Sequence, residues 1–255
     1  MDKHRESLKE LIEQHRPEAI GHRLSSDHRP SYLRDFIYGA IDGTVTTFAV
    51  VSGVAGAGLD SRVIIILGAA NLLGDGFSMA ASNFLGIRAE QQLQQRIRRN
   101  EESHIARYPE GEREEIRQIF HSKGFEGDDL ERVVDVITAD ENQWVETMLT
   151  EEHGIALGGP NPVRAAAMTF VAFVLIGFLP LLAFVIEMIA PGSVGSTYFW
   201  STIITSFVFF AIGAAKSWFI KQPWYWEGFE TLVVGGAAAA LAYLAGMFCS
   251  MAMGA

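Results

Sequence analysis

An acidic side chain stands inside each of two apolar stretches that are long enough to cross a lipid bilayer. In the first, residues 36–58, Asp42 is the only charged side chain among 23 residues. A hydrocarbon core of about 30 Å requires about 20 helical residues, and a carboxylate that faces lipid costs several kcal/mol. We therefore expect Asp42 to face a helix interface or a wet pathway and to take part in function. The alternative is a protonated carboxyl group, or one satisfied by neighbouring threonine hydroxyls.

The second apolar stretch, residues 63–87, carries its polar side chains on one face. Asn71, Asp75 and Met79 recur at intervals of four, which stacks them along one side of a helix. Carboxylate oxygens together with a thioether suit a transition-metal ion better than Na⁺, Mg²⁺ or Ca²⁺. The pattern predicts a metal pathway, with ordinary packing of a methionine as the alternative.

A second group of potential metal ligands lies in the polar segment that follows. Its members are spaced by three or four positions within each pair, so that each pair shares one face of a helix. Converging faces would give a carboxylate-rich site with one imidazole and one thioether. A solvated acidic surface produces such pairs by chance, and spacing alone favours that interpretation. The pairs are Glu101 with His104, Glu112 with Glu115, and Met148 with Glu152.

Composition indicates which elements must position these residues. The chain has 255 residues, of which 49% are hydrophobic and 20% charged, as expected for a membrane domain with a polar insert. Residues 89–160 hold 17 acidic and 8 basic side chains, and therefore most of the net charge of −10. An acidic module favours cations and argues against nucleic acid as a partner. A single cysteine, Cys249, excludes an intrachain disulfide and a cysteine-rich metal site.

The predicted fold class is an all-α integral membrane protein with five transmembrane helices and a cytosolic three-helix acidic insert between helices 2 and 3. At the N-terminus we expect a short amphipathic helix over residues 3–15, ended by Pro17, and no signal peptide. The expected domains are a cytosolic N-terminal helix and linker at 1–35, transmembrane helices 1 and 2 at 36–88, a cytosolic metal-binding helical domain at 89–160, and transmembrane helices 3 to 5 at 161–255.

Helices 1 and 2 should pack as an antiparallel pair because only a turn at 59–62 joins them. Small residues favour close contacts between membrane helices, and Gly39 with Gly43 gives the first helix a G-x-x-x-G step. The second helix should continue out of the membrane, since residues 88–108 contain neither glycine nor proline. Further insert helices are expected at 112–122 and, with a break near Asp140, at 128–153. The remaining spans are expected at 163–190, with a kink at Gly177 and Pro180, at 197–220 and at 229–253.

The distribution of basic residues predicts the orientation. If the spans alternate, one side of the membrane receives nearly all of them, whereas the opposite loops, 59–62 and 191–196, contain only Arg62. By the positive-inside rule, the N-terminus and the insert are cytosolic and the C-terminus is outside. The basic residues on the cytosolic side are Arg29, Arg34, Arg88, Arg96, Arg98, Arg99, Arg164, Lys216 and Lys221.

Four motifs and the acidic insert, in this order along residues 32–253, make the chain resemble a known family. The motifs are DGTVTTFAVVSG at 42–53, DGFSMAASNFL at 75–85, GFLPLL at 177–182 and FET at 229–231. The chain resembles the vacuolar iron transporter family. This resemblance implies a homodimeric, proton-coupled exporter of Fe(II), and often of Mn(II), whose pathway is lined by the first two spans.

The resemblance also implies roles for particular residues. Asp42 and Met79 match the transport residues of the family. Asn71 stands where family members have a glutamate, and Asp75 would replace that carboxylate. In the insert, His104 stands at a family glutamate position and Leu149 at a methionine. The cytosolic metal site of the family matches Glu101, Glu112, Glu115, Met148 and Glu152.

We therefore predict a transporter, not an enzyme, that exports Fe(II), with Mn(II) as a second substrate, in exchange for protons. The ions bind as substrate, and no prosthetic group is expected. The membrane would be the cell membrane in a prokaryote and the vacuolar membrane in a eukaryote.

The alternative is a membrane-anchored ferroxidase or iron-storage protein that uses the insert as a di-iron site. Glu101 and His104 supply one Glu-x-x-His motif, whereas di-iron bundles use two such motifs and two further glutamates. A structural membrane protein whose insert binds a partner is the third hypothesis, and it predicts no metal binding.

Overall fold

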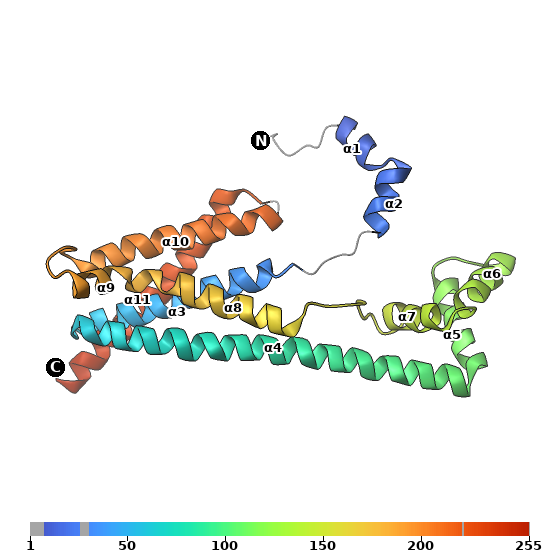
Figure 1. Ribbon diagram of the computed structural model, residues 1–255, viewed down its shortest axis with the longest axis horizontal. Coiled ribbons are helices and arrows are strands. Elements are labelled where there is room, and N and C mark those ends of the chain that lie inside the picture. Colours follow the sequence, from blue (N-terminus) through green and yellow to red (C-terminus); the bar gives the residue numbers. More distant parts are fainter. Residues whose placement is uncertain (1–7, 26–30, 221, 255) are drawn as a thin grey trace. The chain divides into compact units, whose positions relative to one another are not determined.

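The computed structural model describes residues 8–25, 31–220 and 222–254, and within these ranges the regular structure is entirely helical (Figure 1). The chain divides into two compact units, Met1–Ser31 and Tyr32–Ala255. The first unit contributes α1 (Leu8–Gln14) and α2 (Pro17–Ser25). The helix predicted over 3–15 corresponds to α1, and its first five residues lie outside the described ranges. α2 begins at Pro17 because proline is favoured at the first position of a helix.

The second unit contains the five apolar helices that the sequence predicts. Each is long and apolar enough to cross a membrane, which confirms an all-α protein with five candidate spans. Two of the basic residues used to predict the orientation, Arg29 and Lys221, lie outside the described ranges. The spans are α3 (Leu33–Gly56), α4 (Ser61–Arg107), α8 (Pro162–Gly177) with η1 (Leu179–Leu181) and α9 (Leu182–Ile189), α10 (Thr197–Ile220), and α11 (Trp224–Met253).

α4 is one unbroken helix of 47 residues. At about 1.5 Å per residue it is roughly 70 Å long, more than twice the thickness of a hydrocarbon core of about 30 Å. Asp60 caps its N-terminus by accepting a hydrogen bond from the backbone N–H of Arg62 (2.7 Å). Figure 1 shows α4 running from the apolar helices to the insert, so a single rigid element connects the two regions.

The third span bends where the sequence predicts a kink. α8 ends at Gly177, the 3₁₀ turn η1 contains Pro180, and α9 continues the span. Proline removes a helical hydrogen bond and leaves backbone carbonyls without their usual partners. The hydroxyl of Ser201 on α10 donates to the backbone oxygen of Pro180 (2.6 Å), which satisfies one carbonyl at the bend.

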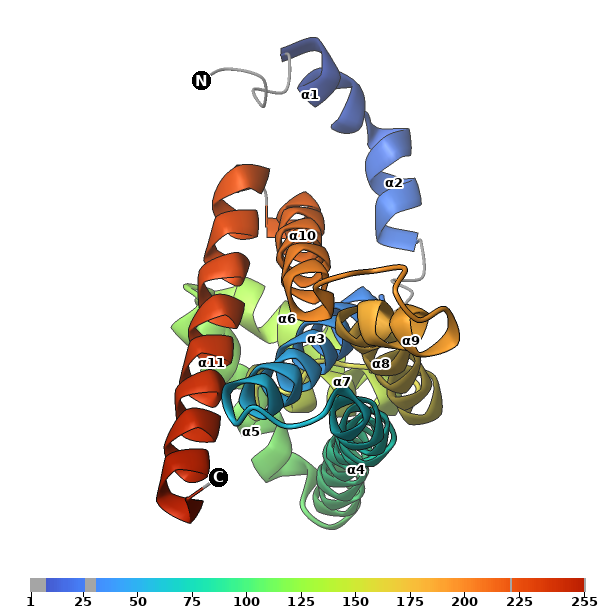
Figure 2. The ribbon, with the colours of Figure 1, turned by 90° about the vertical axis from the view of Figure 1, so that its left-hand side faces the viewer.

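α3 lies at the centre of the apolar helices, enclosed by α4, α8, α10 and α11 (Figure 2). It is in contact with α4, as predicted, but its G-x-x-x-G step faces α8. A Cβ atom added at Gly43 would lie 2.5 Å from the backbone oxygen of Phe173, and one at Gly39 would lie 2.4 Å from that of Thr169. The step therefore allows α3 to approach the backbone of α8 rather than that of α4.

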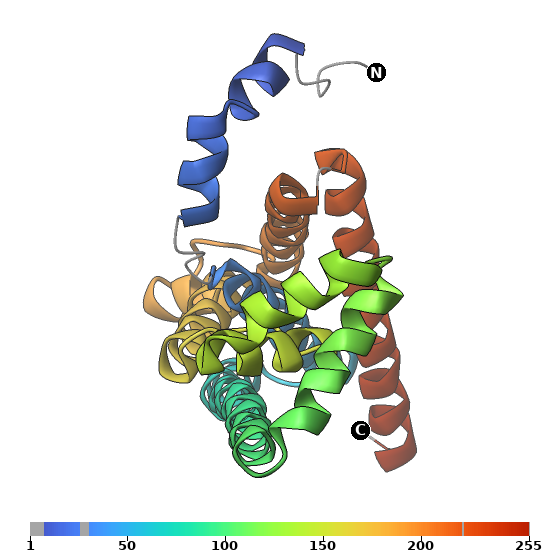
Figure 3. The same ribbon diagram turned by 90° about the vertical axis from the view of Figure 1, so that its right-hand side faces the viewer.

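The insert has a hydrophobic core of its own. The C-terminal end of α4, which we predict to be cytosolic, packs with the helices of the insert. These are α5 (Pro109–Ser122), α6 (Gly127–Thr138) and α7 (Glu141–Glu151), shown in green and yellow-green in Figure 3. The segment 128–153 is broken near Asp140, as predicted, and forms α6 and α7. Asp140 caps α7 by accepting a hydrogen bond from the N–H of Gln143 (2.9 Å). The core contains Ile105, Ile116, Leu130, Val134, Ile137, Trp144, Val145, Met148 and Leu149.

The last span begins earlier than predicted, at Trp224 instead of residue 229. Glu227 therefore lies in the first turn of α11, where it is buried and forms an ion pair with Lys216 of α10 (2.7 Å). The pair joins α10 and α11 near their shared connection.

Candidate metal sites

The polar face of the second span meets the first span. The side-chain amide of Asn71 on α4 donates to the hydroxyl of Thr46 on α3 (3.3 Å), and this hydroxyl donates to the backbone oxygen of Asp42 (2.8 Å). Asp75 lies one turn beyond Asn71 and is close enough for its charge to act on Asp42. Met79, one turn further, is partly buried against the apolar core. Asn71 and Asp42 are therefore linked through Thr46 at the contact between α3 and α4, whereas Asp75 is exposed on the single chain.

Two residues that the sequence analysis missed extend this face. The side-chain amide of Asn83 donates to the carboxylate of Asp35 on α3 (2.8 Å) and to the hydroxyl of Thr169 on α8 (2.9 Å). Asn83 follows Met79 by four positions, and Asp35 precedes Asp42 by seven, so both continue the helical spacing. Continuing that spacing would have found them.

In the insert, two of the predicted glutamates are buried. Glu101 of α4 is 4% exposed and Glu112 of α5 is 7% exposed. The Nδ1 atom of His104 lies 3.4 Å from Oε1 of Glu112. Donor atoms of Glu101, His104 and Glu112 all lie within 4.8 Å of one another, close enough to share one metal ion.

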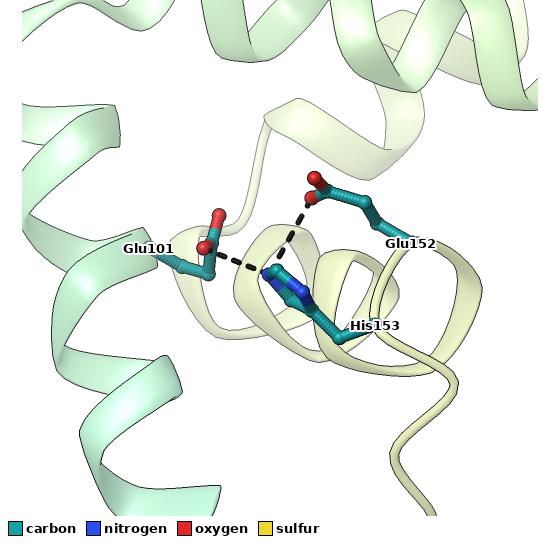
Figure 4. Close-up of side chains that lie close together, drawn as sticks. All are labelled: Glu101, Glu152 and His153. Carbon is teal, nitrogen blue, oxygen red and sulfur yellow. Dashed lines mark hydrogen bonds and ion pairs between the residues drawn. The ribbon is translucent and has the colours of Figure 1, made fainter.

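Glu101 belongs to a second group as well. Its Oε1 atom lies 3.0 Å from Nε2 of His153, and the same nitrogen lies 3.6 Å from Oε2 of Glu152 (Figure 4). Donor atoms of these three residues again lie within 4.8 Å of one another. The sequence analysis missed His153, and its only signal in the sequence is its position next to Glu152.

Glu115 joins the same cluster electrostatically. It is exposed, yet partial loss of hydration and the nearby charges of Glu152 and Glu101 raise its pKa above the usual value. Burial, followed by the charges of Glu115 and Glu101, raises the pKa of Glu112 to about 7. Carboxylates held together in this way repel one another, and a bound divalent cation would remove the repulsion.

Met148, the predicted thioether ligand, is fully buried in the core of the insert. Its backbone oxygen accepts hydrogen bonds from the N–H groups of Glu152 (3.1 Å) and His153 (3.2 Å). Met148 therefore helps to fix the backbone that carries two members of the cluster.

Several other acids of the insert have cationic partners. Arg98 pairs with Glu102, Arg117 with both Glu114 and Glu131, and Lys123 with Glu151. Within the described ranges, no lysine or arginine forms an ion pair with the acids of the cluster, and Glu101, Glu112 and Glu152 pair with histidines. The cluster is thus a group of oxygen and nitrogen donors that has not been neutralised by basic side chains, as suits a site for divalent transition-metal ions. Its acids are Glu101, Glu112, Glu115 and Glu152.

The chain is similar to known proteins over most of its length. A family model described as the VIT family matches residues 33–247. A vacuolar iron transporter of Toxoplasma gondii is 28% identical over 91% of this chain and 81% of its own length. Vacuolar iron transporter 1 of Arabidopsis thaliana is 31% identical over 83% of each chain, and a vacuolar iron transporter of Plasmodium berghei is 29% identical over 89% of this chain and 84% of its own. The chain belongs to the VIT family.

Proposed function

We propose that this protein exports divalent transition-metal ions from the cytosol in exchange for protons, with Fe(II) as the main substrate and Mn(II) as a second one. The names of its relatives support iron. The observation that carries the proposal is that one unbroken helix, α4, bears both Asp75 with Met79 and Glu101 with His104. A capture site and a pathway therefore share one rigid element.

In this proposal, the acidic cluster of the insert captures the ion. The ion then passes to Asp42, Asp75 and Met79. Protons that arrive from the opposite side bind to a carboxylate of the pathway and displace the ion, because metal ligands must be deprotonated to bind. The excess of basic residues beside the insert supports a cytosolic location of the capture site.

We further propose that the protein works as a homodimer. Asp75 is exposed on the single chain although it lies within a membrane-spanning segment. A carboxylate in contact with lipid is unfavourable, so a second copy placed over this face of α4 would line a shared pathway with Asp75.

Flux into proteoliposomes tests the proposal. Vesicles loaded with a metal-quenched dye and a pH dye would receive Fe(II) and then Mn(II) from outside. We expect metal uptake coupled to opposing proton movement in the wild type, and loss of both in Asp42→Asn, which removes the charge at constant size. Asp60→Asn is the matched control, because asparagine keeps the cap of α4 while removing a carboxylate outside the pathway.

Metal uptake without proton movement would contradict the exchange mechanism. Near-normal uptake by Asp42→Asn would contradict the pathway. Oxygen consumption on addition of Fe(II), in place of uptake, would favour the ferroxidase alternative.

A further inference from the structure

The acidic cluster of the insert contains two imidazoles, and one of them, His153, is assigned no role by the sequence motifs. His153 follows the end of α7, and its side chain is 30% exposed, whereas the Glu101 side chain beside it is 5% exposed. The imidazole thus lies between the buried carboxylate and solvent.

The two histidines divide the cluster into two sets of donors. One set is Glu101, His104 and Glu112, and the other is Glu101, Glu152 and His153. Each set offers one nitrogen and two carboxylate groups, and Glu101 belongs to both. A carboxylate has two oxygens, so Glu101 can serve two ions at once.

A buried oxygen in the cluster has no hydrogen-bond partner among the described residues. Oε2 of Glu112 is inaccessible to solvent and accepts no hydrogen bond from any described residue, while Oε1 of the same group faces His104. A buried polar atom without a partner is unfavourable by roughly 1–3 kcal/mol, and more when it is charged. A metal ion bound between Glu112 and its neighbours would supply the missing partner. This orphaned oxygen separates the cluster from an ordinary acidic surface.

We propose that His153 is a metal ligand and that the insert holds two imidazole-bearing subsites that share Glu101. The inference rests on the proposed function, because it specifies which ions the capture site selects. Imidazole nitrogen suits Zn(II), Co(II), Ni(II) and Fe(II), whereas Mn(II) is well served by carboxylate oxygens alone. The two histidines therefore bias capture toward nitrogen-preferring ions and away from Mn(II).

Calorimetric titration of the purified full-length chain with Zn(II), and separately with Mn(II), tests this inference. His153→Gln removes the ring nitrogen but keeps a hydrogen-bond donor for Glu101. We expect Zn(II) affinity at one subsite to fall by about tenfold or more, because losing even a residue that only supports a metal ligand typically costs that much affinity. Mn(II) affinity should change much less. His121→Gln is the matched control, because His121 is an exposed histidine of α5 in the same insert, outside both donor sets.

Two further measurements keep the test decisive. Circular dichroism and melting of the metal-free protein show whether His153→Gln retains the wild-type fold. His104→Gln should weaken Zn(II) binding at the other subsite, and the double variant should weaken both. Equal Zn(II) binding by wild type and His153→Gln would overturn the inference.

The outcomes also separate this inference from the proposed function. Normal Asp42-dependent flux with unchanged Zn(II) binding in His153→Gln would overturn the inference and leave the transporter proposal standing. Zn(II) binding that depends on His153, in a protein that carries no metal across the membrane, would support the inference and overturn the transporter proposal.

Discussion

Individual carboxylates of the insert differ in what surrounds them, and the difference predicts how they titrate. Glu114 and Glu131 accept hydrogen bonds from Arg117, which lowers the pKa of both. Glu112 and Glu115 lose hydration and lie near other acids, and both effects raise the pKa of each. Glu114 and Glu131 are therefore ionised at neutral pH, whereas Glu112, with a pKa of about 7, is partly protonated without metal.

The raised pKa of Glu112 predicts opposite pH effects on the metal-free and metal-bound protein. Between the ordinary value of 4.5 and about 7, the folded state holds a proton that the unfolded state releases. The metal-free insert should therefore lose stability as the pH rises through this window, while metal affinity should rise.

Melting of the metal-free protein between pH 5 and 8 measures this effect. We expect the melting temperature of the wild type to fall by several degrees across the range. The fall should be smaller in Glu112→Gln, which cannot ionise. A wild-type melting temperature that rises over the same range would contradict the assignment.

Among the elements, α3 and α8 pack at their steric limit. The space at Gly43 is closed by the backbone of Phe173, with the oxygen at 2.5 Å and Cα at 2.9 Å from an added Cβ. Backbone atoms cannot move aside as a flexible side chain would. Any side chain at this position must push the two helices apart.

Gly43→Ala should therefore destabilise the membrane domain by about 1–3 kcal/mol, the usual range for overpacking. Gly74→Ala on α4 is the control, because nothing lies within 4 Å of a Cβ at that position and alanine is the better helix former. Thermal unfolding in detergent compares the two variants. Equal melting temperatures would show that α3 and α8 do not meet at Gly43.

At the scale of the whole unit Tyr32–Ala255, the length of α4 leads to a prediction about how metal capture and transport are coupled. Its middle section lies between Met79 in the membrane-spanning part and Glu101 in the acidic cluster, and it includes the exposed residue Gln92. If capture and transport depend on one rigid helix, then a kink in this section should uncouple them. Proline inside a helix removes a backbone hydrogen bond and costs about 3 kcal/mol.

Gln92→Pro should thus reduce metal flux severalfold while leaving Zn(II) binding to the insert close to that of the wild type. Gln92→Ala, which preserves the helix, should behave as the wild type in both assays. Unchanged flux in the proline variant would mean that the continuity of α4 is not required for transport.

The sequence by itself determined the elements, because the signals for them are local. Runs of apolar residues longer than the bilayer thickness fixed the five spans, the absence of glycine and proline over 88–108 fixed the length of α4, and Gly177 with Pro180 fixed the bend. Helical spacing also placed Asn71, Asp75 and Met79 on one face.

Only the tertiary structure decided which faces meet. Gly39 and Gly43 mark a surface for close packing, but spacing within one helix does not identify the helix that packs against it. In the structure that helix is α8. Likewise, Glu101 and Glu112 meet because α4 and α5 fold onto a common core, which desolvates both carboxylates. Adjacent residues of a helix point in different directions, so Glu152 and His153 would not be paired from sequence. They meet beside Glu101 just beyond α7, which ends at Glu151.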